Sequence, residues 1–205
     1  MTHNSQLLFR HSDTLAEFAV SKKAYLAAHP HAPFGYVATS TLAVDLVSGS
    51  EPLILLLQRA AGDDDDPNLW EPAGGACEDD DPSILHGAAR ELREETGLEA
   101  TFFMAQVGEP HLYTLDDGKK VCQFNFLAVP ERDRPVTLDP KEHQRYVWAT
   151  REQVEARKVE EQGIDLEFTR EEVWCTVLAG FGWLSENAAP LEMEKGKLTT
   201  GNYMM

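Results

Sequence analysis

The chain has 205 residues, of which 18 are basic and 35 acidic, so its formal net charge is −17. Hydrophobic residues make up 42% of it, enough for one sizeable folded domain, and no apolar run approaches the roughly 18 residues of a membrane-spanning helix. Proteins that bind polymeric nucleic acid neutralise its phosphates with Lys and Arg, and no basic cluster is present here, so we expect neither a nucleic-acid nor a membrane partner.

The first residues and the cysteines bear on the cellular compartment. Residues 1–6 lack the pattern of a signal peptide. Cys77, Cys122 and Cys175 show no CxxC spacing, and a sparse, odd number of cysteines suggests reduced thiols. We therefore expect a cytoplasmic protein in which each cysteine is a small core or loop residue.

The N-terminal region has a rough helical pattern. Apolar side chains recur through residues 12–29, and the prolines at 30 and 33 end the pattern. Residues 1–34 are thus predicted to form a helical extension, with a loose terminus over 1–11. His29 and His31 lie close together, but without a third metal ligand at a suitable spacing they indicate a surface linker.

Two strands are predicted next, at 36–47 and 53–57, with Ser48-Gly49-Ser50 as the turn. The second is continuously apolar, as expected for a strand that is covered on both faces. It runs into Arg59, for which two roles remain open: contact with a substrate phosphate, and an ordinary surface arginine.

A loop and a helix with many acidic residues follow, over 74–98. Asp81 is predicted to be the N-cap, Pro82 to take the first helical position and Gly97 to end the helix, which places it at about 82–96. At about 100° per residue, three glutamates share one narrow stripe beside the apolar face. These residues are Glu91, Glu94 and Glu95.

The glutamate stripe repels itself and needs a counter-charge. Glu91 and Glu95 are i,i+4 like charges, and Arg90 supplies one positive charge four residues before Glu94. The remaining negative charge suits Mg²⁺, which prefers oxygen ligands and commonly shares them with substrate phosphates. Gly87 lies one turn earlier on the same face, and its missing side chain makes room either for ligand or for close packing against a strand.

Downstream, strands are predicted at 101–107, 121–129 and 144–149, with a hairpin turn at Asp116-Asp117-Gly118. Phe124 is a candidate for stacking on a nucleobase, although an aromatic pair at strand spacing, here Phe124 and Phe126, is more typical of a core. Residues 130–142 form a charged loop that is expected to border the site.

Two helices are predicted at the C-terminal end. Capping boxes begin at Thr150 and at Thr169, and an apolar 3–4 repeat follows the second. Residues 185–205 lack such a repeat and are predicted to be a mobile tail. Strands with helices on either side predict an α/β protein with a mixed sheet between helices.

The stretch 75–98 resembles the Nudix hydrolase family box, a Gly, five residues, a Glu, seven residues, then Arg-Glu-aliphatic-x-Glu-Glu-x-Gly-aliphatic. Gly75 opens it, and residues 90–98 complete its second half. The sequence departs from the family pattern in three ways. Asp81 stands in place of the first Glu, and eight residues instead of seven separate it from Arg90. Ala73 replaces a Pro that is common in the family. The resemblance implies an α/β/α sandwich over about 35–184, which the predicted C-terminal helix closes. The predicted N-terminal helix is an addition that the resemblance does not explain.

The resemblance also implies roles for residues. Glu94 and Glu95 are the expected principal metal ligands, Glu91 the third ligand or the base, and Arg90 the residue that orients Glu94. The main-chain carbonyl of Gly75 is a further expected ligand. Later loop acids, Glu142 and Asp139, are candidates for base or ligand. The residues expected to contact substrate are Arg59, Trp70, Gly75 and Phe124.

The activity implied is Mg²⁺-dependent hydrolysis, with Mn²⁺ as a substitute, of a pyrophosphate bond in a nucleoside diphosphate derivative, ADP-sugars and dinucleotides first. One alternative is a nucleotide-binding or sensor module on the same fold, which binds without cleaving. Another is a diphosphate isomerase, which calls for a reactive cysteine paired with a glutamate. The partner is expected to be a small phosphorylated substrate, and a homodimer is conceivable.

Overall fold

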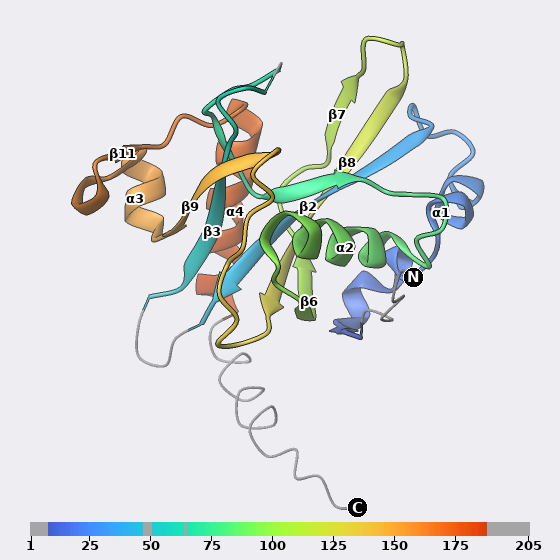
Figure 1. Cartoon of the computed structure of the whole chain (residues 1–205). Helices are drawn as coiled ribbons and strands as arrows, with labels where there is room; N and C mark the ends of the chain where they lie inside the picture. Colours follow the sequence, from blue (N-terminus) through green and yellow to red (C-terminus); the bar gives the residue numbers. More distant parts are fainter. Residues whose placement is uncertain (1–7, 47–50, 64, 188–205) are drawn as a thin grey trace, which may run out of the picture.

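A computed structural model describes residues 8–46, 51–63 and 65–187 (Figure 1). None of the helices in these ranges is long and apolar enough to cross a membrane. In chain order the elements are β1 (Arg10–His11), η1 (Asp13–Phe18), α1 (Lys22–Ala28), β2 (Tyr36–Asp45), β3 (Leu53–Arg59), β4 (Trp70–Glu71), β5 (Ala73–Ala76), α2 (Ile84–Thr96), β6 (Ala100–Gln106), β7 (His111–Thr114), β8 (Lys120–Pro130), β9 (His143–Ala149), α3 (Arg151–Ala156), β10 (Lys158–Val159), η2 (Glu160–Gln162), β11 (Ile164–Asp165) and α4 (Glu171–Glu186).

The sheet is mixed, as predicted. Its main path runs β1-β6-β8-β2-β3-β4, while β5 pairs with β2, β7 with β8 and β9 with β3. The pairs β1–β6 and β2–β8 are parallel, and the other pairs are antiparallel. β7 and β8 form the hairpin that was predicted around residues 116–118.

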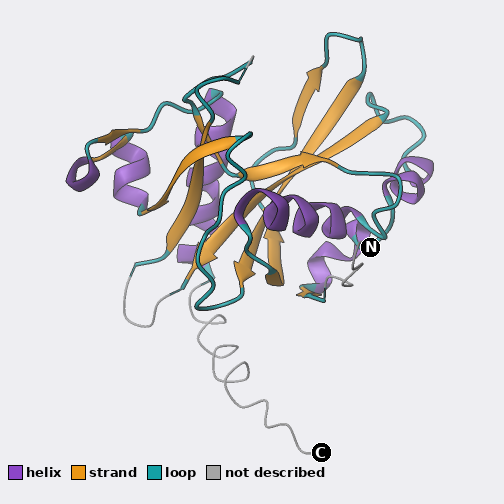
Figure 2. Cartoon of the chain, viewed as in Figure 1, coloured by secondary structure: helices purple, strands orange, loops and turns teal. Residues whose placement is uncertain are grey.

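Helices cover both faces of this sheet (Figure 2). The apolar side of α2 packs on one face with Leu55, Phe103 and Phe126, and α4 packs on the other with Ile54 and Leu127. Because alternate residues of β3 enter opposite cores, its continuously apolar sequence follows from burial on both sides. The α/β/α sandwich is confirmed.

The N-terminal segment differs from the single helix predicted over 12–29. Two short helices form instead, because both Ser12 and Ser21 act as N-caps and accept hydrogen bonds from following backbone N–H groups. Leu15, Phe18 and Tyr25 enter the same core cluster as α2. The boundaries at 34/35 and 184/185 stay predictions.

Helix ends and loops show further differences. The Thr150 capping box is present, whereas α4 begins at Glu171 with Arg170 as its N-cap and no side-chain cap, so the predicted box at Thr169 is wrong. Residues 185 and 186 still belong to α4. The predicted turn at 48–50, residues 1–7 of the predicted loose terminus and the tail over 188–205 lie outside the described residues.

Candidate active site

Helix α2 has the apolar face and the stripe of glutamates that the sequence predicts. Its apolar side, including Leu85, Ala88 and Leu92, is fully buried, and Gly97 ends the helix in the left-handed conformation with φ 71°. The three glutamates differ sharply in exposure. Glu95 is only 4% exposed, whereas the side chains of Glu91 and Glu94 are 14% and 53% exposed. The stripe thus runs from the protein interior to solvent.

Arg90 is the central cation of the stripe. Its Nη1 donates to Glu91 Oε1 at 2.8 Å and to Glu94 Oε2 at 3.0 Å, and its Nη2 donates to the Ala76 carbonyl at 2.9 Å. The contact expected between Arg90 and Glu94 is therefore present, and Arg90 also holds Glu91 and the loop before the helix.

Asp81 binds Arg90 and does not cap the helix. Ser83 is the N-cap and accepts the His86 N–H, so the predicted cap at Asp81 is wrong and the helix begins two residues later than expected. Asp81 is 7% exposed. It accepts Arg90 Nε and Nη2 and, at 2.7 Å, the Glu78 N–H, so that its carboxylate joins the loop to the helix.

Two glycines allow close approach around these acids. A Cβ on Gly75 would lie 2.7 Å from Glu91 Oε1, and a Cβ on Gly87 would lie 2.8 Å from Asp81 Oδ2. The space beside Gly87 is thus occupied by Asp81 and Cys77, which both lie in the preceding loop. The missing side chain of Gly87 was predicted to make room for a ligand or for a packed strand. The space is filled instead by two side chains of the loop, so neither prediction describes it.

A second group of charged side chains surrounds Glu71 on β4. Arg59, at the end of β3, donates to Glu71 Oε1 and to Asp63 Oδ2, both at 2.7 Å. His143 Nε2 lies 3.6 Å from the same Glu71 oxygen. Arg59 is therefore held in an ion-pair network beside the site, and its predicted contact with phosphate stays a prediction.

The loop after β8 contributes the remaining side chains near the glutamates. The Thr137 N–H donates to the Thr96 carbonyl at 2.7 Å and the Asp139 N–H to the Glu95 carbonyl at 3.2 Å, which satisfies free carbonyls at the end of α2. This docking places Glu142 and His143 at Glu95, where one ligand atom from each residue lies within 4.8 Å of the others. Asp139 instead accepts the Lys141 N–H through its side chain.

Burial and mutual repulsion set the acidity of the site. Burial raises the pKa of Glu95 well above its usual value, with a further upward effect from the charge of Glu91, while the Gly74 N–H opposes the shift by donating at 3.1 Å. Burial also raises the pKa of Glu91, against the lowering effect of Arg90. These carboxylates share one partly desolvated space and lack full compensation, which is the environment that a divalent cation stabilises.

The other expected substrate contacts are placed elsewhere. Trp70 is fully buried in the core on the α4 side, which leaves no surface for a substrate to touch. Phe124 is 4% exposed and packs against Phe18 and Tyr25, which is the core position expected of an aromatic pair at strand spacing.

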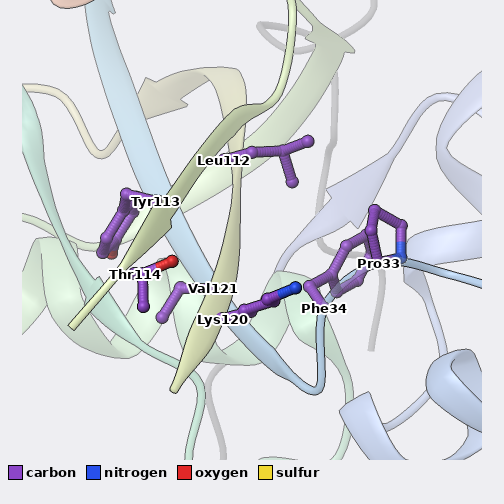
Figure 3. A pocket seen from close by; sticks show the side chains of 7 residues that line it. All are labelled: Pro33, Phe34, Leu112, Tyr113, Thr114, Lys120 and Val121. Carbon is purple, nitrogen blue, oxygen red and sulfur yellow. The ribbon is translucent and has the colours of Figure 1, made fainter. Parts of the chain in front are cut away.

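Two hollows of the described surface lie beside the β7–β8 hairpin. The larger, of about 580 Å³, is apolar and includes Phe124, Tyr25 and Phe34. The smaller, of about 190 Å³, is shown in Figure 3, where Pro33 and Phe34 face Leu112 and Lys120. No residue of the glutamate stripe, and neither Glu142 nor His143, lines either hollow.

Cys77 and Cys122 are poor candidates for a nucleophile. Burial, followed by the charge of Asp81, raises the pKa of Cys77 to about 12, and burial raises that of Cys122 to about 11. Neither thiol is ionised near neutral pH, so neither offers the reactive cysteine that the isomerase alternative needs.

Sequence reasoning missed Glu71 and His143. Neither residue is among the site residues that the sequence predicts. The position of His143 directly after Glu142 was an available signal, but only the strand pairing of Arg59 with His143 shows that it turns toward Glu95 and Glu71.

Residues 38–171 match the family model of the NUDIX domain. The chain is similar to a CTP pyrophosphohydrolase of Escherichia coli (strain K12), with 40% identity over 101 residues that cover 49% of this chain and 68% of that protein. It is also 37% identical over 81 residues to the m7GpppN-mRNA hydrolase NUDT17 of Bos taurus, covering 37% of this chain and 26% of that protein. Among solved structures, a C. elegans Ap4A hydrolase complex superposes with a TM-score of 0.52 at 21% identity, covering 74% of this chain and 99% of that one.

Proposed function

The chain belongs to the Nudix family of pyrophosphohydrolases, and from this premise we propose that it uses a divalent cation, Mg²⁺ or Mn²⁺, to hydrolyse a pyrophosphate bond of a small nucleotide derivative. The observation that carries the proposal is that Glu91 lies against Gly75, Glu95 lies against Gly74 and Glu142, and Arg90 binds Glu91 together with Glu94. Phosphoric anhydrides carry dense negative charge, and their hydrolysis requires neutralisation of that charge and a positioned water.

The donor set fits a hard cation. Glu94 and Glu95, with Glu91 or the Gly75 carbonyl, would hold it, because they offer oxygen ligands and their charges exceed what Arg90 compensates. When bound, such an ion supplies charge neutralisation at phosphate oxygens and lowers the pKa of a coordinated water.

The chain's own groups then position the reaction. Arg90 fixes the carboxylates of Glu91 and Glu94 through its Nη1, which limits their rotation. Glu142 is exposed and lies beside Glu95, so it is placed to accept a proton from an attacking water as general base. Glu91 is the alternative base.

The substrate is proposed as a class. The relative with 40% identity is named for CTP, which makes CTP the first compound to test, together with ADP-sugars and dinucleotides. The larger apolar hollow beside Phe124 contains no residue of the glutamate stripe, so we assign it no part in substrate binding. The possible homodimer and the cytoplasmic location stay predictions.

The test is phosphate or nucleotide release from this panel with Mg²⁺ and separately with Mn²⁺. We expect turnover of at least one compound, and a fall of at least about 100-fold in kcat for Glu94→Gln and for Glu95→Gln, because each substitution removes one charged ligand. Glu99→Gln is the matched control, since Glu99 follows the same helix and pairs with Arg134. Normal turnover by either stripe variant would contradict the metal assignment.

The same assay separates the rival binding module. A nucleotide that binds in the presence of Mg²⁺ and leaves unchanged, across the whole panel, would favour the sensor interpretation. Isomerisation of a diphosphate without release of phosphate would favour the isomerase, which the raised pKa values of Cys77 and Cys122 argue against.

A further inference from the structure

His143 is a buried imidazole with no hydrogen-bond partner. It is 3% exposed, and neither Nδ1 nor Nε2 is hydrogen-bonded among the described residues. A neutral imidazole has one donor and one acceptor nitrogen, and burying both without partners gives up the hydrogen bonds that they make to water in the unfolded chain. Such a residue requires an explanation.

Its neighbours are acids. One nitrogen of His143 and carboxylate oxygens of Glu95 and Glu142 all lie within 4.8 Å of one another. The remaining close acid is Glu71, but the 3.6 Å between Nε2 and Glu71 Oε1 is too long for a hydrogen bond. That oxygen already accepts Arg59 Nη1 at 2.7 Å.

The nearby arginines are engaged with other acids. Arg59 holds Glu71 and Asp63, and Arg90 holds Asp81 together with Glu91 and Glu94. Neither of these two arginines pairs with Glu95 or Glu142 in the described structure. The space between Glu95, Glu142 and His143 therefore contains two acids that neither arginine neutralises. It also contains an imidazole nitrogen that is free to bind a cation.

We propose that Glu95, Glu142 and His143 form a divalent-cation site in which a ring nitrogen of His143 is a direct ligand. The proposal rests on the proposed function, because Glu95 belongs to both ligand sets. With Glu142 as a ligand, Glu91 is left as the general base. It adds a ligand that the glutamate stripe lacks, drawn from β9 instead of α2.

A nitrogen ligand changes which cation is favoured. Carboxylate and water ligands suit Mg²⁺, while imidazole is a good ligand for first-row transition metals. We therefore infer that the site discriminates in favour of Mn²⁺ over Mg²⁺, and that His143 is the cause. His143→Gln keeps a polar side chain but replaces the nitrogen donor with an amide oxygen, which removes the discrimination.

The experiment uses the full chain with Mn²⁺ alone as the probe. Pulsed EPR detects the magnetic coupling between bound Mn²⁺ and a directly ligated ¹⁴N, and a titration of free Mn²⁺ gives the affinity. We expect nitrogen coupling in the native protein, its loss in His143→Gln, and Mn²⁺ binding weakened by about tenfold or more, the scale on which altered metal-site residues act. Mg²⁺ affinity, measured by competition with Mn²⁺, should change less.

His111→Gln is the matched control, because His111 is half-buried and, unlike His143, its Nε2 is hydrogen-bonded to Thr176 on α4. It should leave the nitrogen coupling intact. Absence of coupling in native protein with Mn²⁺ bound overturns the proposal without any variant, as does coupling that persists in folded His143→Gln. If that variant fails to fold, Glu142→Gln still tests the site by its expected loss of Mn²⁺ affinity.

The readouts separate this proposal from the proposed function. Hydrolysis of a nucleotide with Mn²⁺ bound only through oxygen would sustain the function and overturn the role of His143. Nitrogen-ligated Mn²⁺ without turnover of any compound would sustain the site and contradict the hydrolase.

Discussion

Arg90 holds Asp81 by two parallel hydrogen bonds, from Nε to Oδ1 at 3.1 Å and from Nη2 to Oδ2 at 3.0 Å. The pair is largely buried, and it joins the altered part of the box to the helix that carries the glutamates. The substitution of Asp for Glu and the extra residue before Arg90 thus coincide with a bidentate ion pair that gives the loop a fixed attachment.

The first prediction concerns this pair. Asp81→Asn keeps one acceptor oxygen but points an NH₂ group at the donors of Arg90 or Glu78, so we expect a loss of about 2–3 kcal/mol in the free energy of unfolding. Urea unfolding measures it. Asp79→Asn is the control, because Asp79 is a 97% exposed acid of the same loop whose ion pair with Lys22 faces solvent, so its loss should shift the midpoint little. Equal midpoints for both variants would show that the buried pair does not stabilise the fold.

The second prediction concerns Gly87. Alanine is favoured over glycine in helices by about 1 kcal/mol, but a Cβ here would lie 2.8 Å from Asp81 Oδ2. We expect Gly87→Ala to destabilise the protein by about 1–2 kcal/mol, since the new methyl group displaces the Asp81 carboxylate.

Gly182 in α4 gives the comparison for Gly87, because nothing lies within 4 Å of the position where its Cβ would be. Gly182→Ala should raise stability by about 0.5–1 kcal/mol. Thermal or urea unfolding of the two variants should therefore shift in opposite directions. A stabilising effect at both positions would refute the close contact beside Gly87.

The third prediction concerns pH in the absence of metal. Glu95 binds its proton more tightly in the folded chain, because burial raises its pKa well above the unfolded value of about 4.3. Ionising it therefore costs stability as pH rises from the unfolded pKa through the folded one, with a slope of up to about 1.4 kcal/mol per pH unit. Glu95→Gln removes this penalty, so its stability relative to the native chain should increase between pH 5 and pH 8.

Urea unfolding in EDTA at several pH values measures the difference between Glu95→Gln and the native chain. Glu155→Gln is the control, because its side chain is half exposed on α3, and it should show no such growth with pH. If the stability difference between Glu95→Gln and the native chain stays constant across the pH range, the Glu95 carboxyl has the same pKa in the folded and unfolded states, which contradicts the prediction.

The fourth prediction concerns Arg90 in turnover. A lysine ammonium is a point charge and lacks the planar fork that reaches Asp81, Glu91 and Glu94 together. We expect Arg90→Lys to lower kcat by about 100-fold through misplaced carboxylates, on the best substrate of the panel. Arg134→Lys, at an exposed ion pair with Glu99, should keep native kcat. A native kcat in both would remove Arg90 from the positioning of the site.

The helix and its stripe were predictable because they depend on local periodicity. Leu85, Ala88 and Leu92 had to face inward, and this placed the glutamates beside the core. The N-cap was not predictable in the same way, because Asp81 and Ser83 are both good caps and only the position of Arg90 decides between them. Trp70 shows the same limit, since burial in the core depends on strands that are distant in sequence.

The part of the site that the sequence did not reveal comes from pairing across the sheet. His143 lies opposite Arg59 across the β3–β9 ladder, where the register shifts between Gln58 and Arg59. Such a bulge changes the direction of side chains and leaves no local sequence signal in a chain of this kind. Glu142 could be named as a candidate, but not distinguished from Asp139 before the loop was seen docked on α2.

That docking adds a local equilibrium to a site that is otherwise anchored in the sheet. Two backbone amides, of Thr137 and Asp139, connect the loop to the last carbonyls of α2, while the Glu142 carbonyl accepts the Ala60 N–H and His143 pairs with Arg59 of β3. The two loop bonds can therefore open while Glu142 and His143 keep these contacts on the β3 side of the site. The hydrogen-exchange rates of the two amides would report how often this link opens, and a bound cation that bridges Glu95 and Glu142 should slow them together.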